Sequence, residues 1–363
     1  MIKKESASKS WIEAVSKKER NADKILVEKV VRALMLLEGL ATSDLEFVFK
    51  GGTALLLLLG TEKRRLSIDI DIIVPDKEKS LEDILDKICK DYGFTRYEKQ
   101  ERKVKSKIDK DHYQIFFESV VEGKESYVLL DVLREDIHYT TITEVFIAGS
   151  FVDTTGELAK VNVPDFNNIL GDKLTAFAPN TTGIPYLKGE KEMGMEIIKQ
   201  LYDIACLCDR IDNPVIVAEV FTSFAKTEIA YRHDKCSVTD VLEDIIDNAL
   251  EICLRGNHGK ANFEILQKGI IQVRSFIYSE PFHLEKAITC AAKAAYIATL
   301  IKYGKTEIKR YSPDILPELI GWQITEPMNT KLNKIKKSDR DAFFYLYQIY
   351  DIMQNSINNN EKA

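Results

Sequence analysis

The chain has 363 residues, of which 45% are hydrophobic and 30% are charged, and its formal net charge is −6 at pH 7. This length exceeds one typical hydrophobic core, so we expect two domains, and the acidic balance excludes a uniformly basic nucleic-acid binder while leaving room for a local basic patch. No stretch reaches the roughly 18 apolar residues of a transmembrane helix, and no signal-type apolar core follows the first residues, so we expect a cytoplasmic protein without membrane contact.

The N-terminal part of the chain alternates helical and strand patterns. Residues 1 to about 20 are polar and charged, and we interpret them as a solvated lead-in. Apolar residues at helical spacing predict an amphipathic helix from about Ala22 to Gly39, with the glycine as its end. The segment Glu46–Lys50 predicts a short strand that runs directly into Gly51-Gly52, and the apolar residues Thr53–Leu59 predict a short buried helix.

A basic turn, Glu62-Lys63-Arg64-Arg65, separates this helix from a predicted strand over Leu66–Val74. The pattern over Ser80–Asp91 predicts a helix with Ser80 as its N-cap. Further strands are predicted around residues 94–104, 112–121 and 126–134. The last of these is almost continuously apolar, which is typical of a strand covered on both faces, and Asp131 interrupts it.

Beyond about residue 160 the strand patterns stop. Helical patterns then dominate at residues 166–178, 190–210, 214–228, 237–254, 261–277, 282–303 and 338–357. We therefore predict an α/β (α+β) N-terminal domain with a mixed sheet over residues 1–160, followed by an all-α helical-bundle domain over residues 161–363.

The most informative motif is the glycine pair with the carboxylates that follow it. A glycine pair at a strand-to-helix junction lets backbone N–H groups approach a phosphate closely. Ser67, Asp69 and Asp71 alternate with isoleucines, so they share one face of the strand. Two carboxylates this close repel each other unless a divalent cation compensates. The combination predicts metal-dependent attack on a nucleoside triphosphate, and the alternative is an edge strand with a solvated polar face.

Two further residues are candidates because of where they lie in apolar patterns. Asp131 is the candidate third carboxylate, since two-metal sites usually draw a ligand from a neighbouring strand. Alternatively, it lies at a strand end and pairs with Arg134 or faces solvent. Lys173 lies on the apolar face of its helix and needs an anionic partner such as a triphosphate; alternatively, its ammonium group snorkels to solvent. Asp203 by itself would be an ordinary surface aspartate.

Basic residues gather in three stretches that could contact a polyanion: Arg64-Arg65, Arg96–Lys110 and Lys331–Arg340. A solvated face is the alternative for each of them. The five histidines are isolated, with no nucleophile partner within reach in the sequence.

Four of these motifs resemble those of a known family. The stretch Lys50-Gly51-Gly52-Thr53-Ala54-Leu55, followed by Arg65-Leu66-Ser67-Ile68-Asp69-Ile70-Asp71, resembles the opening motif of AbiEii-type nucleotidyltransferase toxins, a branch of the DNA polymerase beta-like superfamily. Asp172-Lys173-Leu174 is similar to the Asp-Lys motif of that family, and Tyr202-Asp203 to its Tyr-Asp motif. The resemblance covers about residues 46–210.

The resemblance implies a nucleotidyltransferase that depends on Mg²⁺, with two ions expected, and that transfers a nucleotide from an NTP to an acceptor, foremost the 3′ end of a tRNA. It also implies a toxin with a possible cognate antitoxin. The implied residue roles are metal binding by Asp69 and Asp71, and nucleotide binding by Gly51, Gly52, Thr53, Arg65, Ser67 and Lys173. Asp203 would be a further catalytic acid, and Asp131 is added from the third carboxylate of the superfamily.

Two other functions stay open from the sequence. The same chemistry could attach the nucleotide to a protein hydroxyl instead of RNA. A protein of the same fold could also bind nucleotide or RNA without turnover, although the intact glycines and aspartates favour catalysis.

Overall fold

The structure, a computed structural model, describes residues 1–60, 62, 65–100, 110–232 and 235–360. The chain divides into two compact units. The first contains Met1–Asp165 and the short segment Ser275–Pro281, and the second contains Phe166–Arg274 and the chain from Phe282 onward. The short segment joins the first unit through backbone and ring contacts: the Leu66 N–H donates to the carbonyl of Phe276 at 2.8 Å.

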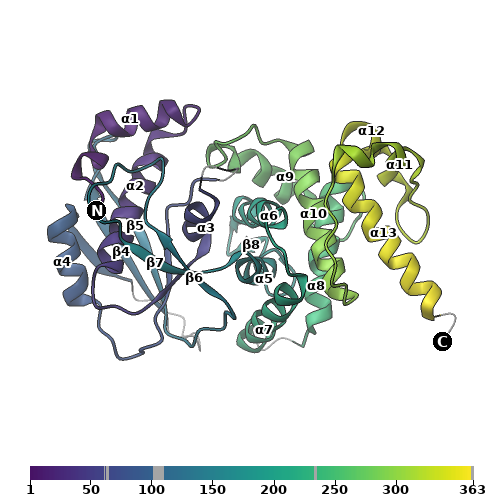
Figure 1. The fold of residues 1–363 in the computed structure, drawn as a ribbon, viewed down its shortest axis with the longest axis horizontal. Helices are drawn as coiled ribbons and strands as arrows, with labels where there is room; N and C mark the ends of the chain where they lie inside the picture. The colour runs from purple at the N-terminus through teal and green to yellow at the C-terminus, as the bar shows by residue number, and fades with distance from the viewer. Residues whose placement is uncertain (61, 63–64, 101–109, 233–234, 361–363) are drawn as a thin grey trace. The chain divides into compact units, whose positions relative to one another are not determined.

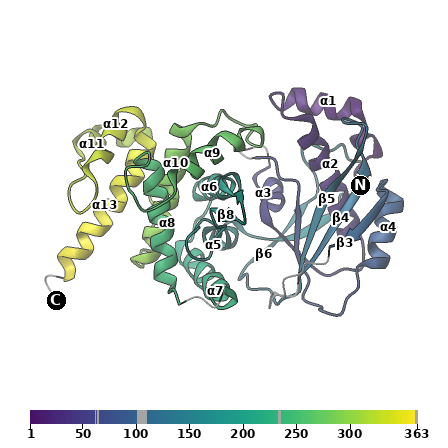
Figure 2. The ribbon, with the colours of Figure 1, turned by 180° about the vertical axis from the view of Figure 1, so that it is seen from behind.

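A mixed sheet forms the centre of the first unit (Figures 1 and 2). Within the described residues its strand order is β1-β2-β5-β4-β3, with β2 and β5 parallel and the other neighbours antiparallel. The strands are β1 (Val48–Lys50), β2 (Ile70–Ile73), β3 (Arg96–Lys99), β4 (Lys110–Glu118) and β5 (Glu125–Leu133). A separate two-stranded sheet pairs β6 (Ile142–Phe146) with β7 (Lys160–Pro164).

One face of the central sheet is packed into the core of this unit. Every second residue of β5 is buried, and Val128, Leu130 and Val132 join Ile70 and Ile72 of β2 in one hydrophobic cluster. The same cluster contains the apolar residues of a long helix, α2 (Lys24–Ala41). The other helices of the unit are α1 (Lys9–Lys18), α3 (Gly51–Leu59) and α4 (Glu82–Tyr92), preceded by the 3₁₀ turn η1 (Lys4–Ala7).

The structure corrects two predictions about strands. The strand expected over Leu66–Val74 is shorter, because residues 66–69 have no regular strand pairing and β2 begins at Ile70. The expectation that β5 is covered on both faces is wrong, since its burial alternates and Tyr127 keeps 38% of its surface exposed. Asp131 therefore lies on the less buried face of its strand.

The structure also corrects the reading of the N-terminus. The first residues are not a solvated lead-in, because they form η1 and α1 and pack against the unit. Ser8 caps α1, and Ile12 and Val15 are buried. The Trp11 indole N–H donates to the carbonyl of Phe151 at 2.8 Å.

The end predicted for the first long helix is wrong as well, since α2 continues through Gly39 to Ala41. A Cβ atom at Gly39 would lie 2.7 Å from Cγ1 of Ile88 in α4. The glycine is therefore a close-packing position between two helices and does not end the first one.

The second unit is mostly helical. Its helices are α5 (Phe166–Ala176), α6 (Gly194–Cys208), α7 (Pro214–Arg232), α8 (Val238–Cys253), α9 (Phe263–Gln272), α10 (Leu284–Lys302), α11 (Leu316–Gly321), α12 (Ile335–Ser338) and α13 (Arg340–Asn360). The seven longest match the predicted helical patterns, whereas the prediction that strands stop near residue 160 missed β7 and a small ribbon of β8 (Leu187–Lys188) and β9 (Lys191–Glu192). Two-residue strands carry too little alternation to be recognised in a sequence.

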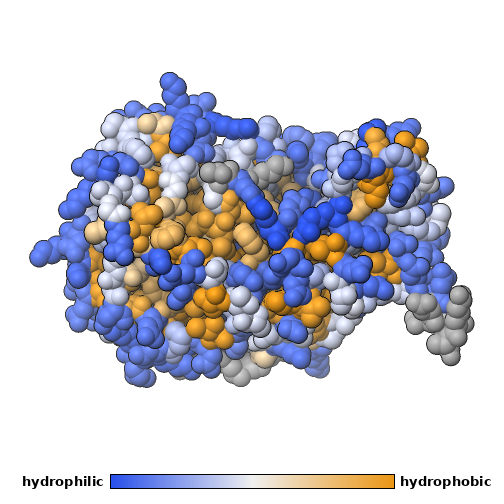
Figure 3. Space-filling view, in the orientation of Figure 1, coloured by the Kyte–Doolittle hydropathy of each residue, from blue (hydrophilic) through white to orange (hydrophobic). Residues whose placement is uncertain are grey.

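Hydrophobic side chains are visible on the surface of the first unit (Figure 3), in the region where Figure 1 shows α3 and β6. Phe146 of β6 is 54% exposed, and Leu57 and Leu58 of α3 are partly exposed. Among the described residues, no helix is long and apolar enough to cross a membrane.

Candidate active site

The strand-to-helix junction after β1 brings a glycine against a carboxylate. Gly51 is the first residue of α3 and has φ of +80°, a backbone conformation that side-chain-bearing residues rarely adopt. A Cβ atom built on it would lie 2.1 Å from Oδ2 of Asp71. Both the backbone and the space at this position therefore require glycine, and the carboxylate of Asp71 rests beside the N-terminus of the helix.

The second glycine is surrounded by two polar side chains. A Cβ atom at Gly52 would lie 2.5 Å from the hydroxyl of Ser67 and 2.6 Å from Nη2 of Arg65. Both side chains are buried, and Nη1 of Arg65 donates to the carbonyl of Leu66 at 3.0 Å. A guanidinium group, a hydroxyl group and the first turn of α3 thus converge, which is an arrangement suited to an anion such as phosphate.

Thr53 fastens the segment that carries the carboxylates. Its side chain is fully buried, and its hydroxyl donates to the backbone carbonyl of Asp69 at 2.7 Å. This bond ties the first turn of α3 to the irregular segment that leads into β2. Asp69 and Asp71 are both partly exposed.

Four charged or titratable residues form a row across the sheet. Lys50 of β1 pairs in register with Asp71 of β2, Asp71 with Asp131 of β5, and Asp131 with His112 of β4. Residues that are directly opposite on neighbouring strands point to the same face of a sheet. The row therefore lies on the face opposite the core that contains α2, with the two carboxylates between the two basic residues.

His112 was missed by the sequence analysis, which treated the histidines as isolated. Its Nδ1 lies 2.6 Å from Oδ1 of Asp131. The suggestion that Asp131 pairs with Arg134 is wrong, because the Arg134 guanidinium instead binds Asp111 through Nε and Nη2 at 3.2 and 3.1 Å. The only signal for the contact between His112 and Asp131, which are 19 positions apart, is the register of the two strands that carry them, and a single sequence does not reveal that register.

The carboxylate oxygens of the candidate residues are suitable ligands for a divalent cation. Asp69, Asp71 and Asp131 offer only oxygen donors, which Mg²⁺ prefers, and two of them are adjacent in register. Among the described residues, no group of three or more His, Cys, Asp or Glu side chains is already gathered as a metal cluster.

The two remaining candidates lie together in the second unit. Nζ of Lys173 on α5 is 2.8 Å from Oδ2 of Asp203 on α6, and the two side chains are only 8% and 3% exposed. Lys173 also donates to Oε1 of Gln200 at 3.2 Å. The anionic partner that Lys173 needs is thus Asp203, so neither snorkelling of the lysine nor a surface position for the aspartate is correct.

The predicted basic stretches differ in how far their charges are compensated. Arg64 and residues 101–109 of the second stretch lie outside the described residues. At the described start of that stretch, Arg96 pairs with Glu125 at 2.7 Å and Lys99 with Asp111 at 2.6 Å. In the third stretch Lys331, Lys334, Lys337 and Arg340 are all exposed, and no ion pair among the described residues involves them.

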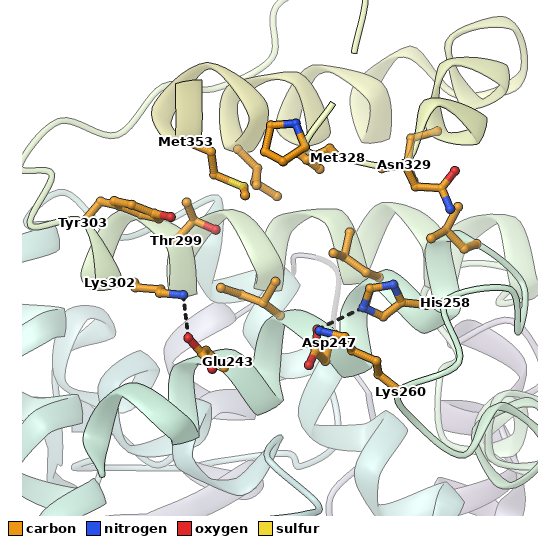
Figure 4. A pocket seen from close by; sticks show the side chains of 16 residues that line it. Glu243, Asp247, His258, Lys260, Thr299, Lys302, Tyr303, Met328, Asn329 and Met353 are labelled. Carbon is orange, nitrogen blue, oxygen red and sulfur yellow. Dashed lines mark hydrogen bonds and ion pairs between the residues drawn. The ribbon is translucent and has the colours of Figure 1, made fainter. Parts of the chain in front are cut away.

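A separate cavity of about 310 Å³ lies in the second unit (Figure 4). Its walls come from α8, α10, α13 and the 3₁₀ turn η4 (Thr330–Lys334). Ion pairs join several of its lining residues: Lys302 pairs with Glu243 at 2.8 Å, and Asp247 pairs with both His258 at 2.9 Å and Lys260 at 3.2 Å (Figure 4). None of the predicted site residues lines this cavity.

Comparison with known proteins gives a family match and several similar structures. A family model described as "Nucleotidyl transferase AbiEii toxin, Type IV TA system" matches residues 35–271. The nucleotidyltransferase toxin MenT4 from Mycobacterium tuberculosis H37Rv is 14% identical, with 93% of this chain and 98% of that chain covered and a TM-score of 0.52, which shows a shared fold. No curated protein matches the chain.

Two structures from Helicobacter pylori are more distant in shape. A putative nucleotidyltransferase is 16% identical, with 77% of this chain and 95% of that chain covered and a TM-score of 0.42. The protein JHP933 is 15% identical, with 77% and 91% covered and a TM-score of 0.40.

Proposed function

The chain belongs to the AbiEii family of nucleotidyltransferase toxins of type IV toxin–antitoxin systems, and on this premise we propose that it transfers a nucleotide from an NTP to the 3′ end of a tRNA. The observation that carries the proposal is the in-register pair of Asp71 and Asp131 on one sheet face, with Asp71 against the glycine that opens α3. Carboxylates can hold a metal ion and a helix N-terminus can hold phosphate groups, so their proximity suits a metal-dependent reaction of a triphosphate.

The triphosphate would bind at the first turn of α3. The backbone N–H groups of Gly51 and Gly52 begin this helix, and the Arg65 guanidinium and Ser67 hydroxyl lie against the second glycine. Thr53 would act through the backbone that it fastens to Asp69. These donors would hold the phosphates by charge and by hydrogen bonds that need no rearrangement during the reaction.

Asp69, Asp71 and Asp131 would hold Mg²⁺, with two ions expected. The bound metal would neutralise phosphate charge and polarise the α-phosphate. Asp131 would accept the proton of the acceptor hydroxyl as the new bond between its oxygen and the α-phosphorus forms. The bond from the α-phosphorus to the bridging oxygen would break, and pyrophosphate would leave, held by Arg65 and the glycine N–H groups.

Lys173 and Asp203 are proposed as a phosphate-binding cation and its positioning carboxylate. Their ion pair of 2.8 Å keeps the ammonium group in a fixed place despite its burial. Gln200 supports the same nitrogen. A lysine held in this way can bind an anion without first losing side-chain freedom.

The third basic stretch supports RNA as the acceptor. Lys331, Lys334 and Lys337 recur every three residues along η4 and α12, and they are exposed. Leu332 and Ile335, from the same segment, are buried, so the strip has a fixed apolar side and a basic outer side. Uncompensated cations on a fixed surface are suited to a phosphate backbone. We also propose a cytoplasmic location, where NTPs and tRNA occur, and a cognate antitoxin.

The experiment that tests this function is incubation with total RNA and each α-³²P-labelled NTP in turn. Label that is lost on RNase treatment and kept on protease treatment supports an RNA acceptor. The opposite pattern would mean nucleotidylation of a protein hydroxyl. NTP binding by calorimetry without pyrophosphate release over hours would show a binding protein without turnover, and it would overturn the catalytic proposal.

A further inference from the structure

His112 and Asp131 form a close polar pair beside the proposed metal-binding carboxylates. Nδ1 of His112 is 2.6 Å from Oδ1 of Asp131. The oxygens of a carboxylate group accept hydrogen bonds, so a hydrogen on Nδ1 of His112 satisfies this contact, with the imidazole as donor.

The two side chains differ in burial, and therefore in how many rotamers each can adopt. The His112 side chain is 8% exposed, whereas the Asp131 side chain is 37% exposed. A carboxylate that is more than a third exposed can take several rotamers unless another group holds it. The imidazole is the group that is fixed by the fold, and the carboxylate is the one that gains order from the contact.

The backbone leaves His112 little choice of position. Strands β4 and β5 pair over nine successive residues, from Lys110 with Leu133 to Glu118 with Glu125. Within this ladder His112 is directly opposite Asp131, and Asp131 is directly opposite Asp71 on its other side. Asp131 therefore lies between a buried histidine and the carboxylate of Asp71.

We propose that His112 is a positioning residue for the nucleotidyl transfer: its Nδ1–H holds Oδ1 of Asp131 and leaves Oδ2 for the metal and the acceptor hydroxyl. The inference rests on the proposed function, because it assigns a purpose to the orientation of Asp131. Removal of a group that hydrogen-bonds to a metal-binding side chain and orients it typically lowers metal affinity or activity by about 10–100-fold. His112 itself touches neither the nucleotide nor the acceptor in this account.

The test uses three substitutions of His112 in the full chain. The side-chain amide nitrogen of Asn can stand where Nδ1 of histidine stands, so His112→Asn keeps the donor, whereas His112→Gln moves it and His112→Ala removes it. We expect Gln and Ala to lower kcat by about 10–100-fold with KM for the NTP nearly unchanged. His112→Asn should restore kcat to within a few-fold of the wild type.

A second readout does not depend on turnover. Binding of Mn²⁺ alone, followed by calorimetry, should weaken by about 10-fold in His112→Gln and His112→Ala and be retained in His112→Asn. The matched control is His258→Ala, which removes another His–Asp pair, with Nε2 of His258 2.9 Å from Asp247 in the second unit. This control should change neither kcat nor Mn²⁺ affinity.

The outcomes separate the inference from the function on which it rests. If the wild type labels an acceptor but His112→Asn is as impaired as His112→Ala, or His112→Ala keeps full kcat and Mn²⁺ affinity, the positioning role is wrong. If the wild type labels no acceptor with any NTP, the proposed function fails, and unchanged Mn²⁺ affinity across the three variants would then overturn the positioning role as well. Thermal unfolding of each variant shows whether the fold is kept.

Discussion

The charged candidate site residues lie in opposite environments in the two units of this protein. In the first unit, carboxylates of neighbouring strands are adjacent in register, and Asp131 keeps 37% of its side chain exposed. In the second unit, Lys173 and Asp203 neutralise each other at 2.8 Å with less than a tenth of either side chain exposed. The first arrangement accumulates like charge at a surface, and the second compensates charge in the interior.

This difference indicates which cluster is built for a ligand. Adjacent carboxylates repel each other, and a bound cation relieves this repulsion. Metal binding is therefore favourable at such a site. In a buried ion pair the two charges already compensate each other. The pair costs desolvation free energy, and losing one partner leaves the other charge buried and unpaired. Removing one of the first unit's metal-binding carboxylates should therefore reduce function with little loss of stability, whereas breaking the ion pair of the second unit should reduce stability first.

The largest expected effect on stability is at the buried pair. Asp203→Ala would leave the Lys173 ammonium buried without its carboxylate, and we expect a loss of about 3–5 kcal/mol in the free energy of unfolding. The double variant Lys173→Met/Asp203→Leu should regain most of this stability, because apolar residues can replace a buried ion pair. Urea unfolding measures both.

The double variant also sharpens the comparison between the units. The role proposed for Lys173 in phosphate binding requires that this stable protein be inactive in the labelling reaction. A double variant that is stable and fully active would show that the pair is structural and would contradict the phosphate-binding role proposed for Lys173.

The next effect in size concerns the glycine that lies against Asp71. Gly51→Ala would force a side chain into a φ of +80° and place its Cβ 2.1 Å from Oδ2 of Asp71. We expect about 1–3 kcal/mol of destabilisation from strain, together with a loss of activity of about 10-fold or more as the carboxylate is displaced. Chemical unfolding and the labelling rate measure the two effects.

The control for this variant lies at the other end of the same helix. Gly60 also has a positive φ, of +59°, but no described atom lies within 4 Å of its added Cβ. Gly60→Ala should therefore cost stability and leave activity unchanged. Equal activity losses at the two glycines would mean that strain in α3, and not the position of Asp71, controls the reaction.

A pH-dependent effect is expected at Asp111, near the start of β4 in the same sheet. Burial acts to raise the pKa of its carboxyl, but hydrogen bonds from Lys99 and Arg134 outweigh burial and hold the pKa below its usual value of 3.8. A lowered pKa in the folded state stabilises the protein above the unfolded pKa, and this contribution is lost as the pH falls through the folded value.

Asp111→Asn should consequently destabilise the protein by about 1–2 kcal/mol at pH 7. The difference from the wild type should shrink as the pH falls below about 4, where the unfolded carboxyl is protonated. Unfolding midpoints measured between pH 2 and pH 7 test this, and a difference that does not change with pH would contradict it.

The smallest expected effect concerns RNA affinity. Replacing Lys331, Lys334 and Lys337 with Gln should reduce the slope of log affinity against log salt by about 2–3, so that tRNA binding is weakened most at low salt. The control variant replaces three exposed lysines of α1 with Gln: Lys9, Lys17 and Lys18. An unchanged salt slope in the first variant would remove this strip as an RNA contact.

Much of the fold and part of the site could be predicted from the sequence, for physical reasons. The long helices of the second unit repeat apolar residues over many turns, so they were recognised. The glycine pair and Asp71 were recognised from their local motifs, although the contact between Gly51 and Asp71 itself depends on the pairing of β1 with β2. Gly39 was misread as a helix end because its packing against Ile88 depends on tertiary structure.

The residues that the sequence could not supply depend on pairing between strands. Lys50 and His112 join Asp71 and Asp131 only through the register of four strands. Asp203 looked like a surface residue because its partner, Lys173, lies 30 positions earlier on another helix. Contacts of this kind are set by the fold as a whole, and local patterns do not encode them.

The central claim is that the carboxylates of the first unit carry the chemistry. The most direct measurement is the rate of labelled-nucleotide transfer by Asp71→Asn, compared with the wild type and with Asp91→Asn, which changes an exposed acid on α4. We predict a loss of at least about 100-fold for Asp71→Asn, with the unfolding midpoint unchanged and with wild-type activity in Asp91→Asn. Transfer by Asp71→Asn at the wild-type rate would contradict the account.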